Sequence, residues 1–533
     1  MNVRSLAVPL LAVAAGCGSP TATPSDLAGS PDMTTGSDTL VMTAQGALMG
    51  VSEGATRVFR GIPYAAPPVG ANRFRSPQPP VAWQGVRDAS MFGPKCPQLA
   101  LTGGGYDATT SEDCLTLNVW APAGAGTPRP VMVFIHGGGF VSGSGSEILY
   151  NGENLSQAGD VVVVTLNYRL GPLGFLALPS LDGEDPAHAT SGNYGIEDQT
   201  AALKWVSANV AAFGGDPANV TLFGESAGGA STCVQLVAPA SAPFIHRAIV
   251  ESGLCTLIAP THAQVLAAGQ ALAKATGCDG GDATAQRACL RALTAKQVST
   301  ALPLHAGLLF GDGASWTPNV DGVVVPAAPA KLFAEGKEAK VPLIVGANFD
   351  EGTLFFALAG NDIDEPTLRG ALLGFLSGAQ ADKVLAQYPV ANYASANDQG
   401  IHVLDDMILC DARRVARAHV AAGNEVYYYD FKHPFKFLYP NLGAFHSAEL
   451  PFVFGNAYEG IFALAPEEEP LSKAMQGYWT AFATAGSPDG AMPPPAVAWP
   501  RYAAATDQDL SLDVTIAAES DLRKKACDFW DAL

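Results

Sequence analysis

Six short apolar runs recur along the main part of the chain, at residues 131–135, 161–166, 220–223, 247–250, 341–345 and 426–429. Runs this continuous, without polar alternation, are typical of strands in a parallel sheet that is covered on both faces. Between two of them, residues 196–213 carry apolar side chains at helical spacing, and Gly214-Gly215 ends that pattern. The alternation predicts one α/β domain over residues 39–533, with a large, mostly parallel central sheet and helices on both faces.

The first 38 residues have a different pattern. A short basic start precedes an apolar run, Ser5–Ala15, which is too short to span a bilayer and is typical of a signal-peptide core. The run ends at Ala14-Ala-Gly-Cys17, which resembles a bacterial lipobox, so we expect residues 1–16 to be removed and Cys17 to carry lipid. An ordinary secretory signal cut nearby is the alternative. Residues 17–38, rich in small and polar residues, are expected to form a flexible tether.

Charge limits the range of partners. The chain has 30 Lys and Arg against 50 Asp and Glu, a net charge of −20. Such a surface repels nucleic acid and anionic lipid headgroups. We therefore expect a small neutral or cationic substrate, no nucleic-acid partner, and contact with a membrane only through the N-terminal lipid anchor.

The segment around Ser226 has the pattern of a nucleophile elbow. The apolar run Asn219–Phe223 leads into Gly224-Glu225-Ser226-Ala227-Gly228, and small residues typical of a helix start follow. This G-x-S-x-G turn holds a serine above a sheet with its Oγ exposed. Gly224 and Gly228 are required because a Cβ there would clash where strand and helix approach each other. The alternative is a glycine-rich turn with a serine helix cap.

A serine nucleophile needs a base, and the base needs an orienting acid. His446 lies in a loop after the last expected core strand, and Asp350 and Glu351 closely follow the strand expected at 341–345. Since loops at the carboxyl ends of parallel strands share one edge of the sheet, either acid could reach His446, and the order serine, acid, histidine is that of hydrolases with this elbow. The amides of His136-Gly-Gly-Gly-Phe140, after another strand, could complete an oxyanion hole.

Together these segments resemble the type-B carboxylesterase family, which has the α/β-hydrolase fold and includes the cholinesterases and some fungal lipases. The similar segments extend over nearly all of residues 40–533, at 59–77, 111–120, 133–142, 167–171, 192–229, 342–352 and 443–455. The resemblance implies one carboxylesterase catalytic domain that cleaves carboxylic esters through an acyl-enzyme intermediate, without cofactor or metal. It makes Ser226 the nucleophile, His446 the base and Glu351 the acid, and it implies oxyanion donors at Gly138, Gly139 and Ala227.

The resemblance also implies residues around the substrate. Glu225 and Glu449 match acids that line the family's active-site floor, and Tyr106, Trp316 and Phe355 are expected to lie in the substrate pocket. Two internal ion pairs of the family are matched by Arg73 with Glu112 and by Arg169 with Asp198.

Departures from the cholinesterases bear on selectivity. Those enzymes hold a quaternary ammonium group on a tryptophan in the first disulfide loop, whereas residues 97–113 here have Tyr106 as their only aromatic residue. Their acyl pocket is narrowed by phenylalanines, whereas residues 311–314 here are small or acidic. We therefore expect no choline-ester selectivity and a roomier acyl pocket. No oligomerisation tail follows Cys527, so we expect a monomer.

Cysteine placement agrees with the resemblance, which pairs Cys96 with Cys114, Cys278 with Cys289, and Cys410 with Cys527. Disulfides suit an exported protein, either held in the cell envelope or secreted. If Cys17 carries lipid, Cys233 and Cys255 are left over, and their even number favours a fourth bridge. The alternative for these two is a pair of buried, unreactive thiols.

Two other functions compete with the esterase interpretation. The first is a non-catalytic cell-surface adhesion relative, but such relatives have usually lost a member of the triad, and all three are present here. The second is a lipase that acts on longer-chain acylglycerols. The 97–113 loop is short, glycine-rich and mostly polar, which is a poor composition for the apolar lid of a lipase.

Overall fold

A computed structural model of the protein describes residues 38–533, except for 101–104, 125, 185–188, 258–259, 304–314, 360–362, 436–440, 457–463 and 491–496. The expectations for the signal peptide, for Cys17 and for nearly all of the tether therefore fall outside the described residues. The same holds for the small acyl-pocket positions 311–314.

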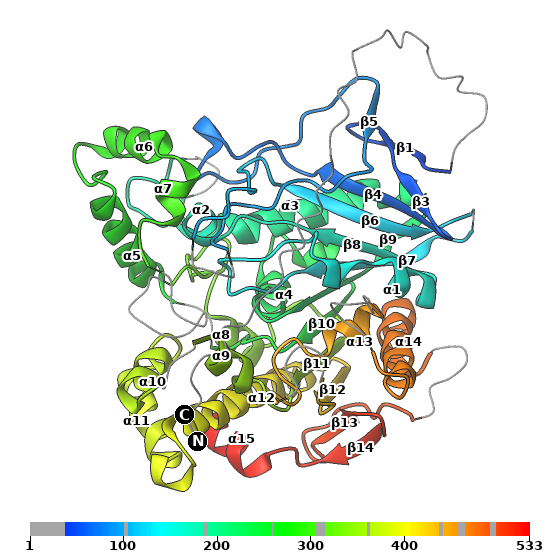
Figure 1. The fold of residues 1–533 in the computed structure, drawn as a ribbon, viewed down its shortest axis with the longest axis vertical. Helices are drawn as coiled ribbons and strands as arrows, with labels where there is room; N and C mark the ends of the chain where they lie inside the picture. The colour runs from blue at the N-terminus through cyan, green and yellow to red at the C-terminus, as the bar shows by residue number, and fades with distance from the viewer. Residues whose placement is uncertain are drawn as a thin grey trace.

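An 11-stranded sheet forms the centre of the described part of the molecule (Figure 1). Its neighbouring strands β8-β7-β9-β10-β11-β12-β13 are parallel, and antiparallel strands extend both edges. The six expected strands are β7 to β12, which confirms the predicted sheet. The strands are β3 (Val51–Glu53), β4 (Thr56–Pro63), β6 (Thr116–Pro122), β7 (Arg129–Ile135), β8 (Val162–Leu166), β9 (Gly215–Glu225), β10 (Arg247–Glu251), β11 (Leu343–Asn348), β12 (Val426–Phe431), β13 (Gln508–Leu512) and β14 (Ala517–Ser520).

Helices cover the sheet on both faces and extend beyond it. The α-helices are α1 (Glu153–Gly159), α2 (Gly171–Phe175), α3 (Tyr194–Asn209), α4 (Ala227–Val237), α5 (His262–Ala275), α6 (Ala283–Ala292), α7 (Ala295–Ser299), α8 (Pro329–Ala334), α9 (Gly352–Ala359), α10 (Glu365–Leu372), α11 (Gly378–Gln387), α12 (Ala396–Ala421), α13 (Leu450–Phe454), α14 (Glu469–Ala485) and α15 (Lys524–Asp531). The helix expected at 196–213 is α3, continued by a 3-10 turn at Val210–Phe213. Gly214, with φ of 85°, ends that turn as predicted.

Two apolar cores explain why the strand sequences do not alternate. On β7, Val131, Val133 and Ile135 pack into one core with residues of α3, α4 and α12. Met132 and Phe134 pack into the other core with residues of α1, α13 and α14. Because both faces of the central strands are buried, every position along them favours an apolar side chain.

Smaller elements flank this framework. A second, three-stranded sheet near the start of the described chain contains β1 (Leu40–Thr43), β2 (Gly46–Met49) and β5 (Val86–Asp88). The group α5–α7 and the pair α10–α11 lie on the same side of the molecule, above and below one another in Figure 1. Among the described residues, no helix has the length and apolarity needed to cross a bilayer.

Covalent and ionic links join distant segments. All three disulfides implied by the resemblance are present, and Cys233 and Cys255 form the fourth, with their Cα atoms 5.5 Å apart. The expected ion pairs are also present: Arg73 with Glu112 at 2.5 Å and Arg169 with Asp198 at 2.7 Å.

Candidate active site

Ser226 stands at a sharp turn between β9 and α4. Its φ of 57° and ψ of −120° form a conformation that non-glycine residues rarely adopt, as expected for a strained nucleophile elbow. A Cβ added to Gly224 would lie 2.5 Å from the backbone of Gly228, and one added to Gly228 would lie 1.9 Å from the carbonyl oxygen of Ile135. The predicted steric need for both glycines is therefore confirmed.

The expected acid and base meet at the carboxyl edge of the sheet. Glu351 Oε2 lies 2.5 Å from Nδ1 of His446, and both side chains are buried. The other oxygen, Oε1, accepts a hydrogen bond of 2.7 Å from the backbone N–H of Asn348 at the end of β11. The carboxylate of Asp350 instead accepts a hydrogen bond from the backbone N–H of Ala444 at 2.8 Å. Of the two acids, the one that contacts the histidine is therefore Glu351.

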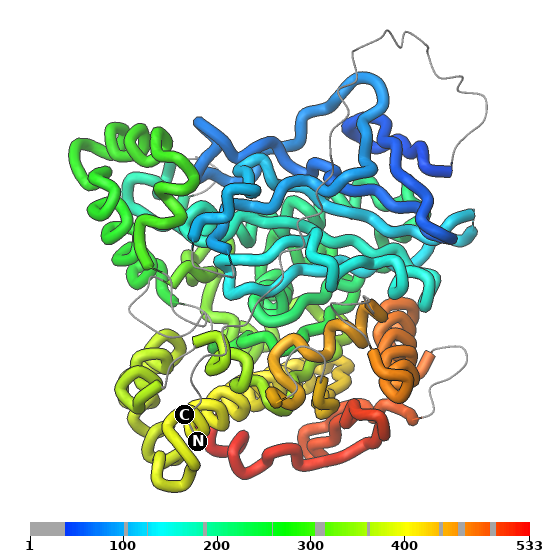
Figure 2. The backbone as a smooth tube through the Cα atoms, viewed as in Figure 1, coloured from blue at the N-terminus to red at the C-terminus, as the bar shows by residue number. Residues whose placement is uncertain are grey.

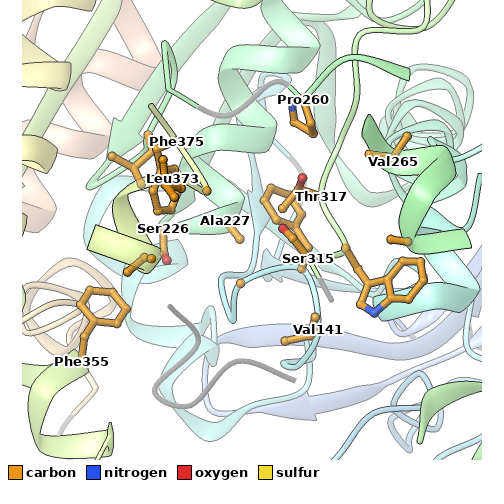
Figure 3. A pocket seen from close by; sticks show the side chains of 18 of the residues that line it. Val141, Ser226, Ala227, Pro260, Val265, Ser315, Thr317, Phe355, Leu373 and Phe375 are labelled. Atoms are coloured by element: carbon orange, nitrogen blue, oxygen red, sulfur yellow. The ribbon is translucent and has the colours of Figure 1, made fainter. Parts of the chain in front are cut away.

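A cavity of about 570 Å³ opens over the elbow and is lined by both Ser226 and His446 (Figure 3). Gly139 and Ala227, two of the expected oxyanion donors, line the same cavity, whereas Gly138 does not. Gly138 and Gly139 have φ of 103° and 60°, so this turn requires glycine. A Cβ on Gly137 would lie 3.1 Å from that of Ser226, which shows how closely the triglycine loop approaches the elbow.

The expected pocket residues fall into two groups. Trp316 and Phe355 line the cavity, and the Phe355 ring lies 4.7 Å from that of His446. Tyr106 is not among the lining residues, because it is held within the first disulfide loop, where Thr110 Oγ1 donates to its hydroxyl at 3.2 Å. The expectation for Tyr106 is thus corrected. Further apolar lining residues, which no sequence motif singled out, include Leu254, Val265, Leu302, Leu373, Phe375 and Met407.

Glu225 and Glu449 require a second correction, because both are fully buried and neither lines the cavity. Glu225 Oε1 accepts a hydrogen bond from Ser447 Oγ at 2.6 Å and lies 3.1 Å from Nε2 of His446, without the angle of a hydrogen bond. Glu449 Oε2 accepts from the Asn348 side chain. These acids form a layer behind the histidine, and burial raises the pKa of each.

This layer controls the charge of the histidine. Burial lowers the pKa of His446, but the carboxylates of Glu225 and Glu351 outweigh it and raise the pKa to about 9. Glu251, at the end of β10, belongs to the same layer and was missed from the sequence. Burial raises its pKa to about 8, and Trp479 Nε1 donates to it at 2.7 Å. An acid directly after the apolar residues 248–250 was the signal that could have revealed it.

Comparison with known proteins agrees with this geometry. The model of the carboxylesterase family matches residues 37–530. The para-nitrobenzyl esterase of Bacillus subtilis (strain 168) is 40% identical over 499 residues, which are 90% of this chain and 96% of that protein. A fatty acyl-CoA hydrolase precursor, medium chain, of Anas platyrhynchos is 36% identical over 522 residues, 90% of this chain and 88% of that protein.

Solved structures show the same relationship. A structure of a PNB esterase superimposes with a TM-score of 0.81 at 38% identity, covering 92% of this chain and all of that one. The fold is therefore the α/β-hydrolase fold of the carboxylesterases. The chain belongs to the carboxylesterase family and is a serine hydrolase of carboxylic esters.

Proposed function

We propose that Ser226, His446 and Glu351 form the catalytic triad of this esterase. His446 takes the proton of Ser226 Oγ while Oγ attacks the ester carbonyl carbon, and the imidazolium then gives that proton to the departing alcohol oxygen. A water, deprotonated by His446, next attacks the acyl carbonyl carbon; the bond to Ser226 Oγ then breaks, the imidazolium returns the proton to Oγ, and the acid leaves. The 2.5 Å contact between Glu351 and His446, beside a strained elbow serine in one cavity, is the observation that carries this proposal.

The oxyanion formed in each step is proposed to accept hydrogen bonds from the amides of Gly138, Gly139 and Ala227. The amide of Ala227 lies at the N-terminus of α4, where the helix dipole favours negative charge. Support comes from the positive φ values of both glycines and from the position of Gly139 and Ala227 on the cavity wall.

The hydrogen bond from Ser226 Oγ to His446 is proposed to form when an ester enters. In the structure Nε2 of His446 has no hydrogen-bond partner, and its nearest acid is Glu225, with Oε1 at 3.1 Å. Catalytic hydrogen bonds are often long before substrate binds and shorten in the complex.

The cavity extends to both sides of Ser226, and the proposed reaction indicates which side holds the alcohol and which holds the acyl chain. In Figure 3, Phe355 lies on one side of Ser226, Val265 and Thr317 lie on the other, and Leu373 and Phe375 lie above it. Since His446 protonates the leaving alcohol, we assign the alcohol to the side of Phe355, whose ring contacts His446. The acyl chain then lies toward Val265 and Thr317.

We propose neutral esters with a medium-length acyl chain as the substrate class. The cavity is lined mostly by apolar residues, and the medium-chain fatty acyl-CoA hydrolase precursor of Anas platyrhynchos is a relative over most of the chain. A panel of p-nitrophenyl esters tests this. Each added CH₂ should raise kcat/KM by up to about fourfold, the equivalent of ~0.8 kcal/mol, until the acyl side is full. A maximum at acetate would contradict the assignment.

Ser226→Ala tests the nucleophile. This variant should lose both ester hydrolysis and covalent labelling by an organophosphate while keeping the wild-type circular dichroism spectrum. Ser252, which also lines the cavity, provides a control, since Ser252→Ala should still be labelled. Labelling of Ser226→Ala would place the nucleophile elsewhere.

We also propose that the mature protein is a monomer, exported and held by lipid on Cys17. Four disulfides in the described chain support an oxidising compartment. Cys17→Ser should release the protein from the membrane fraction, and light scattering should give the mass of one chain. Finding the wild-type protein unacylated and fully released would contradict the anchor.

A further inference from the structure

The turn that carries Glu351 is held from outside by groups far away in the sequence. Phe349 and Gly352 flank the acid and its neighbour Asp350 between β11 and α9. The backbone carbonyl of Phe349 accepts a hydrogen bond of 2.7 Å from Nη2 of Arg523. On the other side of Glu351, the backbone N–H of Gly352 donates to Asp405 Oδ1 at 2.7 Å. The acid is thus fixed on both sides by side chains that do not contact the histidine.

Arg523 contacts groups on both sides of Glu351, since it binds the Phe349 carbonyl and also lies near Asp405. Its Nη1 lies 2.8 Å from Asp406 Oδ1 and 3.8 Å from Asp405 Oδ2, and its guanidinium lies 4.2 Å from the centre of the Phe349 ring. Only the planar guanidinium of an arginine can donate to a carbonyl and a carboxylate at once while it stacks on an aromatic ring. Arg523 itself has a φ of 45°, a left-handed conformation that is costly for a side chain of this size.

The buried acids need this cation. Asp405 and Asp406 are 2% and 7% exposed. Burial raises the pKa of Asp405, and His402 and Arg523 oppose that rise. Without Arg523 the carboxyl of Asp405 would more readily take up a proton, and its hydrogen bond to the amide of Gly352 would weaken.

A disulfide fixes the position of the C-terminal segment along α12. Asp405 and Cys410 both lie on α12, and Cys410 is bonded to Cys527 across 117 residues of sequence. Arg523 precedes Cys527 by one helical turn. The disulfide therefore holds the guanidinium close to Asp405 and Asp406 on α12. Figure 2 shows the C-terminal segment lying beside α12.

We propose that Arg523, with Asp405 and Asp406, is a positioning residue for the catalytic acid, through which the C-terminal segment aligns Glu351 with His446. The proposal rests on the proposed function, since it takes Glu351 as the acid of the triad. Glu351 Oε2 lies only 2.5 Å from Nδ1 of His446, so a small displacement of the carboxylate would break this contact. A misplacement of ~1 Å at a catalytic group can lower the rate about 100-fold.

Kinetics distinguish positioning from a general loosening of α12. Met407 and Ile408, the next residues of α12, line the substrate cavity, so a loosened helix would change KM. Loss of acid alignment instead lowers kcat with little change in KM. We expect Arg523→Ala to lower kcat for p-nitrophenyl butyrate by about 10- to 100-fold. Arg523→Lys, which keeps the charge but not the fork, should fall between Arg523→Ala and wild type.

Arg414 provides a matched control. It also joins α12 to the C-terminal segment, through a hydrogen bond from Nη2 to the carbonyl of Trp530. Its other polar contacts are with Thr256, Asp411 and Asp531, which are not part of the Glu351 turn. Arg414→Ala should lower the melting temperature while leaving kcat close to wild type. If Arg523→Ala does not fold, Arg523→Lys decides, and wild-type kcat in that variant would overturn the proposal.

A double-mutant cycle completes the test. If Arg523 acts through Glu351, removing it from Glu351→Gln should cost much less than removing it from the wild type. An equal fold-loss in both backgrounds would overturn the positioning role. Wild-type turnover in Glu351→Gln alone would instead overturn the proposed triad, so the two failures are distinguishable.

Discussion

Glu351 contacts His446 through a carboxylate oxygen 2.5 Å from Nδ1, whereas the adjacent acid, Asp350, holds the backbone of the histidine loop. Two neighbouring carboxylates of similar sequence context thus have separate tasks. In the proposed triad Glu351 stabilises the imidazolium, whereas Asp350 accepts from the N–H of Ala444 and fixes the loop that carries the histidine.

The first prediction separates these tasks. Glu351→Gln should lower kcat by on the order of 10³- to 10⁴-fold, because a neutral amide neither stabilises the imidazolium nor reliably holds the required tautomer. Asp350→Asn should cost far less, since an amide oxygen can still accept from Ala444. Steady-state kinetics on p-nitrophenyl butyrate measure both. A greater loss in Asp350→Asn would make Asp350 the acid.

The second prediction concerns pH. His446 must be neutral to accept the serine proton, so activity rises with pH through its pKa, which Glu225 helps to raise to about 9. Glu225→Gln removes a nearby negative charge and should move the acidic limb of kcat/KM to lower pH by about 1 unit.

Glu449→Gln is the control for that shift. Burial raises the pKa of Glu449 well above its usual value, and its carboxyl contacts the Asn348 side chain and not the imidazole, so Glu449→Gln should leave the pKa of His446 close to wild type. The acidic limb of this variant should stay in place. An unmoved limb in Glu225→Gln, or a moved one in Glu449→Gln, would show that another group sets the profile.

The third prediction concerns the Cys233–Cys255 bridge. It joins α4, seven residues after the nucleophile, to the segment that includes Leu254 on the cavity wall. Replacing both cysteines by alanine should lower stability by roughly 2–4 kcal/mol. It should also raise KM for p-nitrophenyl hexanoate more than for the acetate, because the longer acyl chain reaches the loosened wall. Equal changes for the two esters would indicate a purely structural bridge.

The fourth prediction concerns stability at alkaline pH. Asp430 and Asp509 lie on the neighbouring strands β12 and β13 with almost no exposure, near Lys432, Glu519 and Tyr428. Burial and a hydrogen bond with Asp430 raise the pKa of Asp509 to about 8, whereas an unfolded aspartate titrates near ~3.9. The folded state therefore binds more protons between these values, and this group makes stability fall as pH rises from about 4 to 8.

Asp509→Asn should remove this loss of stability with rising pH. The difference in melting temperature between pH 5 and pH 9 should be smaller in this variant than in the wild type. Asp382→Asn, which changes an exposed aspartate paired with Arg369, serves as the control and should leave the difference as it is. An unchanged difference in Asp509→Asn would mean that the carboxyl is already ionised at pH 5.

The sequence by itself determined the features that local physics controls. Continuous apolar runs identified β7 to β12 because strands buried on both faces exclude polar residues. The elbow glycines around Ser226 were predictable from the G-x-S-x-G pattern, and for Gly224 the clash is with the local backbone of Gly228, whereas for Gly228 it is with Ile135 on the neighbouring strand β7. The shared edge at the strand ends predicted that Asp350 or Glu351 could reach His446, and the choice of Glu351 over Asp350 followed from the family resemblance.

Only the tertiary structure decided which distant side chains share a buried site. Short edge strands such as β3 and β14 are stabilised mainly by their partners and were missed. The placement of Glu225 behind His446, the exclusion of Tyr106 from the cavity, and the reach of Arg523 to Phe349 all depend on packing between segments far apart in sequence. Periodicity and motif spacing report burial and local geometry, whereas such contacts depend on how whole elements are packed against one another.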